Sequence, residues 1–252
     1  MAAGQKTQPV PSVWARRAAR EAEQPGLSQD AIVREAIAML DADGIEALSM
    51  RKLAARLNAG ATSLYRHVAT KDELMELAVD QVFAEVAVAV PPTGSGGWRP
   101  AATAAAGSFR ATALRHPWLS SVLGQAGLAH LGPNLMNFSN RLGSVFVEAG
   151  FPSPSRAIEA ICGYVIGMAT TEAAWLTTVA KSGESEAEFV ARLMPAAQLA
   201  AEGHEHLTDA YAEAATDTFD PVAARDAKFD YGLEAMLDGL ALRLPGGPPS
   251  AR

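Results

Sequence analysis

Apolar residues recur at intervals of three and four along most of the chain, which is the spacing of one face of an α-helix. No stretch of any length alternates apolar and polar residues as a strand would. The pattern therefore predicts an all-α fold. The predicted helices lie at about 28–43, 50–57, 60–67, 71–86, 99–115, 118–124, 133–149, 154–180, 186–201 and 222–243.

Residues 48–71 contain two short helical stretches joined by a tight turn. The residues predicted to face inward are Leu53 and Leu57 in the first helix and Leu64 and Val68 in the second. Ser49 precedes the first helix as an N-cap. Asn58 follows it, because Asn is the residue besides Gly that best tolerates the left-handed conformation at a helix end. A helix, a tight turn and a second helix form the arrangement that places its second helix in a DNA major groove.

The next segment marks a domain boundary. Thr70 and Glu73 form a capping box, which starts the helix predicted at 71–86. The run of proline and glycine at 91–97 then interrupts the helical pattern. The sequence therefore predicts a flexible N-terminal arm at 1–27, a three-helix helix-turn-helix domain at 28–90 and a second helical domain at 98–244.

Charge is distributed unevenly along the chain, whose net charge is −7. Residues 48–71 carry five basic side chains and no acidic one. Residues 1–71 hold ten Lys and Arg against seven Asp and Glu, whereas residues 72–252 hold eleven against twenty-one. Binding of a polyanion depends on the local field more than on the net charge, so the basic segment favours DNA as its partner.

The basic segment resembles the DNA-binding part of the tetracycline-repressor (TetR) family. The residues that carry this resemblance are Ser49, Arg51, Leu53, Ala54, Thr62, Leu64, Tyr65, His67, Val68, Lys71 and Leu74. The block LYRHV at 64–68, followed by Lys71, is a specific signal. Asn58 stands where the family usually has Gly, which is a tolerated exchange in a turn. The resemblance implies a transcriptional repressor and not an enzyme.

Seven residues are the candidates for contact with double-stranded operator DNA: Ser49, Arg51, Ala61, Thr62, Tyr65, His67 and Lys71. Thr62 can hydrogen-bond a base or touch a thymine methyl group, whereas Ala61 can make only apolar contacts. The resemblance implies that Tyr65 and His67 contact DNA phosphates or the methyl groups at base edges, and that Arg51 can reach a base. Lys71 begins a helix whose amide dipoles would face the same phosphate as its ammonium group.

The second helical domain carries four further motifs that resemble the C-terminal domain of the tetracycline-repressor subgroup. They are HPWL at 116–119, LGPN at 131–134, YVIG at 164–167 and YGLEAMLDGL at 231–240. The resemblance implies a ligand-binding and dimerisation domain with a pocket for a small hydrophobic effector. The candidate pocket residues are Phe109, Trp118, Asn134, Asn137, Phe138, Arg141, Tyr164, Met168, Thr171, Glu172 and Trp175. For each aromatic residue, a plain core position stays open as the alternative.

The helices predicted near 154–180 and 222–243 are apolar on more than one face, so they must be buried on several sides. Pairing with a second copy is the simplest way to achieve this. The resemblance implies the same, namely a four-helix interface across a two-fold axis. Such a homodimer would read a palindromic operator.

Few other residues suggest chemistry. Cys162 is the only cysteine, which fits a reducing cytoplasm, and no run of eighteen apolar residues could span a membrane. No nucleophile elbow, P-loop, dinucleotide fingerprint or HExxH motif is present, so no cofactor is expected. His130 falls where tetracycline repressors bind a magnesium–drug complex, but Pro133 replaces a required threonine. His204 and His206 are expected in a solvated acidic loop, and no metal site is predicted.

The sequence leaves a second functional class open. An all-helical small-molecule-binding protein or enzyme could keep a helix-turn-helix as a relic without DNA-binding function. The dependence of duplex DNA affinity on salt distinguishes the two classes, because phosphate contacts give a linear fall of log affinity with log salt.

Overall fold

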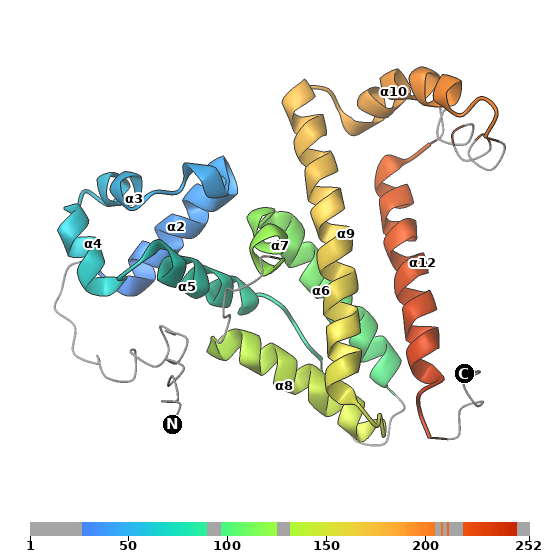
Figure 1. Cartoon of the computed structure of the whole chain (residues 1–252), viewed down its shortest axis with the longest axis horizontal. Helices are drawn as coiled ribbons and strands as arrows, with labels where there is room; N and C mark the ends of the chain where they lie inside the picture. Colours follow the sequence, from blue (N-terminus) through green and yellow to red (C-terminus); the bar gives the residue numbers. More distant parts are fainter. Residues whose placement is uncertain are drawn as a thin grey trace, which may run out of the picture. The chain divides into compact units, whose positions relative to one another are not determined.

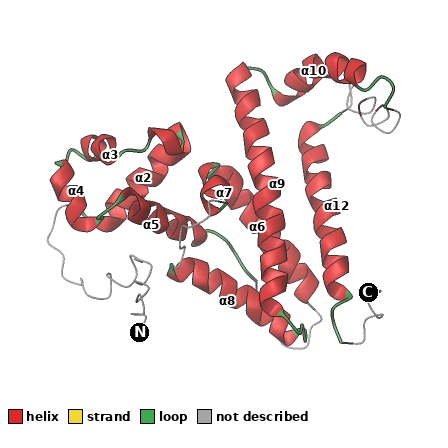
Figure 2. Cartoon of the chain, in the orientation of Figure 1, coloured by secondary structure: helices red, strands yellow, loops and turns green. Residues whose placement is uncertain are grey.

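The computed structural model describes residues 27–89, 97–124, 132–204 and 219–245, together with Thr208 and Tyr211. These residues form helices and connecting loops without a strand, as Figure 2 shows, so the all-α prediction is confirmed. The predicted arm at 1–27, the break at 91–97 and His130 fall almost entirely outside the described residues. The chain divides into two compact units, residues 1–149 and residues 150–252.

The first unit begins with the three helices of the predicted helix-turn-helix domain (Figure 1). Helix α2 spans Gln29–Asp43, a 3₁₀ turn η1 spans Ile45–Ala47, and α3 and α4 span Met50–Arg56 and Ala61–His67. Ser28 caps α2 through a hydrogen bond from the backbone N–H of Ala31 to its hydroxyl. Gly44 ends α2 with a positive φ of 77°.

Helix α5 (Lys71–Phe83) packs against α2 and α8. The sequence predicts this helix as far as residue 86, and that boundary is wrong by three residues. Val86 and Val88 are buried while Ala87 and Ala89 are exposed, so the chain is extended here. The backbone N–H of Ala87 donates to the hydroxyl of Ser108 at 2.8 Å, which supplies the hydrogen bond that a longer helix would have provided.

Three further helices complete the first unit: α6 (Trp98–Arg115), α7 (Trp118–Leu123) and α8 (Pro133–Glu148). Helix α8 packs against both α5 and α6. The second unit contains α9 (Pro154–Ser182), α10 (Glu186–Ala200) and α12 (Pro221–Ala241), with α9 packed against both of the others. The bounds of these six helices lie within two residues of the predicted ones.

Candidate DNA-binding interface and effector-binding residues

The helix-turn-helix is built from local signals that the sequence carries. Ser49 caps α3, because its hydroxyl accepts a hydrogen bond from the backbone N–H of Lys52 at 3.3 Å. Asn58 follows α3 with a φ of 50°, and it is the one non-glycine among the described residues with a positive φ. Leu53, Leu64 and Val68 are completely buried. Three of the four residues predicted to face inward are therefore confirmed, whereas Leu57 is only half-buried.

The opposite face of α3 and α4 is open to solvent. Arg51, Ala61, Thr62 and Tyr65 are exposed, and 49% of the Tyr65 surface is accessible. Because a core tyrosine would be covered, the exposure of Tyr65 leaves its ring and hydroxyl able to meet a ligand. Four of the seven candidate DNA contacts thus share an outward surface of the two helices.

The other three candidates are partly buried and have structural partners. Ser49 serves as the N-cap of α3. The backbone carbonyl of His67 accepts a hydrogen bond from the side-chain amide of Gln29 at 3.1 Å, which holds the end of α4 to the start of α2. The ammonium group of Lys71 lies 3.4 Å from the carbonyl oxygen of Ile45. Lys71 therefore ties the start of α5 to η1.

The start of α5 is capped from two sides. The hydroxyl of Thr70 accepts from the backbone N–H of Glu73 at 3.0 Å, as the capping box predicts. The carboxylate of Glu73 accepts from the backbone N–H of Ala69 at 3.2 Å, one residue before the predicted partner. The three-residue connection between α4 and α5 is thus hydrogen-bonded to the first turn of α5.

Two of the candidate pocket residues belong to a closed aromatic cluster. Phe109 on α6 and Phe138 on α8 pack against Phe83 on α5, with ring centroids 5.3–5.9 Å apart. All three rings are buried, and only 1% of the Phe109 surface is accessible. The geometry is that of a core, which the sequence left open as the alternative for each aromatic.

The HPWL motif forms a polar junction at the corner between α6 and α7. His116 Nδ1 lies 2.8 Å from Asp41 Oδ1, and the indole N–H of Trp118 donates to the same oxygen at 2.7 Å. Glu85, which follows α5, accepts from Arg115 at 2.7 Å and lies 3.4 Å from His116 Nε2. Trp118 is thus held to α2. Neither Asp41 nor Glu85 could be singled out from the sequence, because their partners are distant along the chain.

The Glu85 junction has a testable pH dependence. Burial raises the pKa of Glu85, but the hydrogen bonds from Arg115 and His116 outweigh it and hold the pKa below its ordinary value of 4.5. A lowered pKa in the folded state contributes stability that is present above the unfolded-state pKa and is lost as pH falls through the folded-state pKa.

Replacing Arg115 by alanine is therefore expected to lower the melting temperature at neutral pH and to flatten its fall below about pH 5. Melting curves recorded across this range measure the effect. Arg156→Ala, at an exposed arginine of α9, is the matched control and should keep the wild-type acid limb. Parallel acid limbs in wild type and Arg115→Ala would contradict the assignment.

On α8, Asn134 is engaged with a residue that the sequence did not single out. Its side-chain amide donates to Asp80 Oδ2 at 2.9 Å, and its backbone N–H donates to Asp80 Oδ1 at 2.8 Å. Asn137 and Arg141 lie one and two turns further along α8 and are exposed. These two residues remain polar candidates for an effector.

The candidates in the second unit mostly connect its helices. The hydroxyl of Tyr164 on α9 donates to the carbonyl of Phe229 on α12 at 2.7 Å, and its ring lies against Gly232 so closely that a Cβ there would overlap it. Met168 is half-buried, and the hydroxyl of Thr171 donates to the Met168 carbonyl at 2.9 Å. Tyr164 therefore acts as a spacer between α9 and α12.

A charged cluster joins α9, α10 and α12. Arg225 on α12 donates to Glu172 on α9 at 3.0 Å and also to Glu186 on α10. The indole N–H of Trp175 donates to Glu186 at 2.6 Å. Glu172 is 8% exposed, so its charge depends on the guanidinium group. Glu172 and Trp175 are thus engaged in packing the unit.

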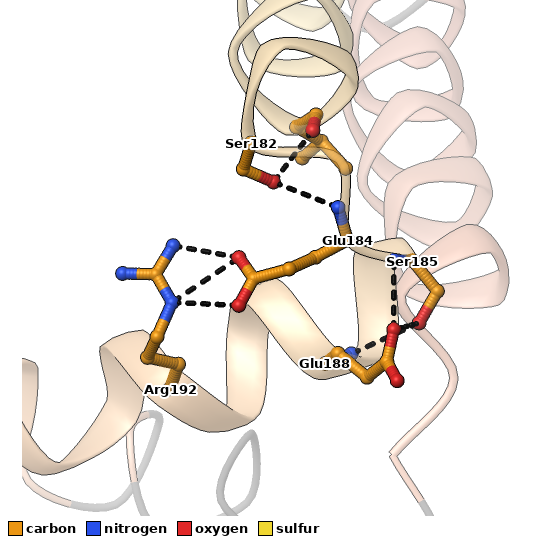
Figure 3. Close-up of polar contacts among 6 residues, drawn as sticks. Ser182, Glu184, Ser185, Glu188 and Arg192 are labelled. Atoms are coloured by element: carbon orange, nitrogen blue, oxygen red, sulfur yellow. Dashed lines mark hydrogen bonds and ion pairs between the residues drawn. The ribbon is translucent and has the colours of Figure 1, made fainter.

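The start of α10 carries a second, exposed group of charges, drawn in Figure 3. Arg192 donates three hydrogen bonds to the carboxylate of Glu184 at 2.7–3.1 Å, and Ser185 forms a capping box with Glu188. The hydrogen bond from Arg192 holds the pKa of Glu184 below its ordinary value. These contacts fix the turn between α9 and α10.

The described residues give little support to metal binding or to nucleophilic catalysis. They contain no group of three His, Cys, Asp or Glu that could hold a metal ion. Cys162 is a free thiol whose pKa is raised by burial to about 11, so it is a weak nucleophile. Among the helices described, none combines the length and apolar character needed to cross a membrane.

Two family models and several known transcriptional regulators match this chain. The family model described as "Bacterial regulatory proteins, tetR family" matches residues 32–78, and "Tetracyclin repressor-like, C-terminal domain" matches residues 90–244. An HTH-type transcriptional regulator of Saccharopolyspora erythraea is 41% identical over 166 residues, which are 65% of this chain and 69% of the relative. The HTH-type transcriptional repressor DrrR1 of Streptomyces coeruleorubidus is 34% identical over 86% of this chain and 78% of its own.

A solved structure of a TetR family protein also has a similar fold. ActR of Streptomyces coelicolor, a TetR family protein crystallised with actinorhodin, superposes with a TM-score of 0.70 and is 28% identical. The match covers 90% of this chain and all of that one. The curated relatives are transcriptional regulators, as the sequence predicts, and not enzymes.

Proposed function

Because this chain belongs to the TetR family of transcriptional regulators, we propose that it is an effector-responsive repressor that binds a palindromic operator as a homodimer in the cytoplasm. A small hydrophobic molecule bound by the C-terminal domain releases it from DNA. The observation that carries the proposal is the outward face of α3 and α4, where Thr62 and Tyr65 stand exposed within a basic segment.

Operator binding is supported by how this face is constructed. Helix α4 contributes base-edge candidates on one side and buries Leu64 on the other, so its orientation is fixed by the core. Arg51 is exposed at the start of α3, and Lys71 stands at the N-terminus of α5. A helix N-terminus and a lysine together favour a phosphate.

Dimer formation is supported by the surfaces of α9 and α12. Tyr231 on α12 is 79% exposed, and Val222 and Leu242 on or beside the same helix are also open. The exposed positions of α9 include Gly163 and Gly167, which permit close approach of another helix. A second copy would cover these apolar side chains, as expected for a homodimer through the helices at 154–180 and 222–243.

The proposed effector is a small hydrophobic molecule, and the crystal structure of ActR in complex with actinorhodin makes that compound a suitable first probe. The sequence predicts eleven candidates for the effector contacts, of which Phe109 and Phe138 pack in the core here: Phe109, Trp118, Asn134, Asn137, Phe138, Arg141, Tyr164, Met168, Thr171, Glu172 and Trp175. Among these, Asn137, Arg141 and Met168 carry side chains for which no hydrogen bond or ring contact is described, so we expect them to respond first to an effector.

The experiment is a binding titration with the duplex DNA that flanks the protein's own gene. Tyr65→Ala is expected to weaken binding by about tenfold or more, because one good base contact is worth about 1–3 kcal/mol. Lys71→Ala should weaken binding to all sequences alike and reduce the slope of log affinity against log salt by about one. Fluorescence anisotropy at several salt concentrations measures both effects.

Lys181→Ala is the matched control, since it removes the same charge from an exposed lysine at the end of α9. Its affinity and salt slope should equal those of the wild type. Binding that is unchanged in Tyr65→Ala and Lys71→Ala would remove these residues from the interface. A wild-type chain that binds no duplex at all would favour the alternative of a helical protein without DNA-binding function.

A further inference from the structure

Asp80 on α5 is a buried carboxylate with an unusual position: it caps a helix to which it does not belong. It is 3% exposed. Its Oδ1 accepts from the backbone N–H groups of Asn134 and Leu135 at 2.8 and 3.1 Å, and its Oδ2 accepts from the Asn134 side chain at 2.9 Å. These are the second and third residues of α8, which are the donors that an N-cap side chain normally satisfies.

The sequence around the start of α8 creates this arrangement. Gly132 occupies the N-cap position and has no side chain with which to accept. Pro133 at the first helical position has no N–H, so the free donors begin at Asn134. A Cβ on Gly132 would overlap the Asp80 carboxylate. The backbone at Gly132 has a φ of −68° and a ψ of 154°, which any residue adopts, so glycine is required here by space alone.

Helix α5 connects this cap directly to the recognition helix. Its N-terminus is bonded to Ala69 and Ile45, and only three residues separate it from α4. The residues at 73–80 are all buried, so α5 runs through the core of the first unit. A displacement of the first turn of α8 must either break three charge-assisted hydrogen bonds or move α5 with it.

We propose that Asp80 is a positioning residue that couples the first turn of α8 to α5 and thereby to the DNA-binding face. The inference rests on the proposed function, since it specifies how occupancy of the C-terminal domain reaches the operator contacts. Coupling is reciprocal, so operator binding at α4 must also alter the first turn of α8. That reciprocal effect is measurable with DNA alone, without the effector.

The test is hydrogen exchange at the amides of Asn134 and Leu135, with and without the operator duplex. In the wild type, the duplex is expected to change these exchange rates by about fivefold, the lower end of ordinary coupling between sites. Asp80→Ala should abolish the change while the protein still binds the duplex. Asp80→Asn should keep it, because rotation of the Asn134 amide lets its oxygen accept from the amide introduced at position 80.

Two variants separate coupling from loss of stability. Asp41→Ala removes a carboxylate that ties α2 to the α6–α7 corner and should leave the response at α8 intact. Gly132→Ala introduces a methyl group against Asp80 and should weaken the response without removing any polar group; it carries the test if Asp80→Ala does not fold.

The outcomes are distinct. A wild-type protein that binds the duplex without a change at Asn134 and Leu135 overturns the inference and leaves the proposed function standing. An undiminished change in Asp80→Ala or Gly132→Ala overturns it as well, as does an equal loss of the response in Asp41→Ala. Absence of duplex binding by the wild type overturns the proposed function and the inference with it.

Discussion

Replacing Phe109 by alanine is expected to lower the free energy of unfolding by about 4 kcal/mol, within the range that truncation of a buried phenylalanine costs. The ring is 1% exposed and packs against Phe83 and Phe138, so its removal leaves a cavity where α5, α6 and α8 meet. The loss combines the transfer free energy of the ring with the cost of that cavity. Urea denaturation followed by circular dichroism measures the change.

The same variant tests whether Phe109 fills the core or lines an effector pocket. Phe189 on α10 is half-buried against Trp175, and Phe189→Ala serves as the control, with a smaller expected loss. A loss below about 1 kcal/mol for Phe109→Ala would mean that the ring already borders open space. In that case Phe109 would be better placed to line an effector pocket than to fill the core.

Replacing Arg225 by alanine is expected to lower the free energy of unfolding by about 3 kcal/mol, because it leaves the buried Glu172 and the partly buried Glu186 without their counter-charge. Burial lowers the pKa of Arg225, but the hydrogen bonds to Glu186 and Glu172 outweigh it and raise the pKa above its ordinary value. Arg192 offers a matched comparison on the same unit. It pairs with Glu184 (Figure 3), and its side chain is 59% exposed, so Arg192→Ala should leave stability nearly unchanged.

A third variant tests whether uncompensated carboxylate charge causes the loss of stability in Arg225→Ala. Combining Arg225→Ala with Glu172→Gln and Glu186→Gln removes the uncompensated charges and should restore part of the lost stability. Thermal unfolding and urea denaturation both report the three values. Equal losses for Arg225→Ala and Arg192→Ala would show that water screens the Arg225 cluster as it screens the surface pair. A triple variant less stable than Arg225→Ala would show that uncompensated charge is not the cause of the loss.

The sequence predicts those parts of the fold that depend on neighbours along the chain. Ser49 and Thr70 cap their helices through residues three positions away, and Asn58 adopts the left-handed conformation that its side chain tolerates. Both the residue types and the spacing of such contacts are visible in the sequence. For this reason the helix boundaries could be predicted closely. The exception is the end of α5, where the chain at Val86 and Val88 is extended instead of helical.

The candidate effector residues were harder to predict because their roles depend on partners that are distant in sequence. Trp118 is held by Asp41, which lies 77 residues earlier, and Asn134 is held by Asp80, which lies 54 residues earlier. An aromatic side chain at helical spacing looks the same in a core as in a pocket wall, so Phe109 could not be assigned from periodicity. The acidic partners on α2 and α5 carry no local signal at all.

The seven-residue length of α4, the proposed recognition helix, has a consequence for how DNA-binding preference could change. An isolated helix of two turns is not stable in water, so α4 owes its shape to Leu64 and to the carbonyl of His67, which Gln29 holds. Ala61, Thr62 and Tyr65 are exposed, and their side chains take no part in the hydrogen bond from Gln29. If these three residues contact bases as proposed, substitutions at them should change base preference with little effect on folding, because the packing of α4 depends on other residues.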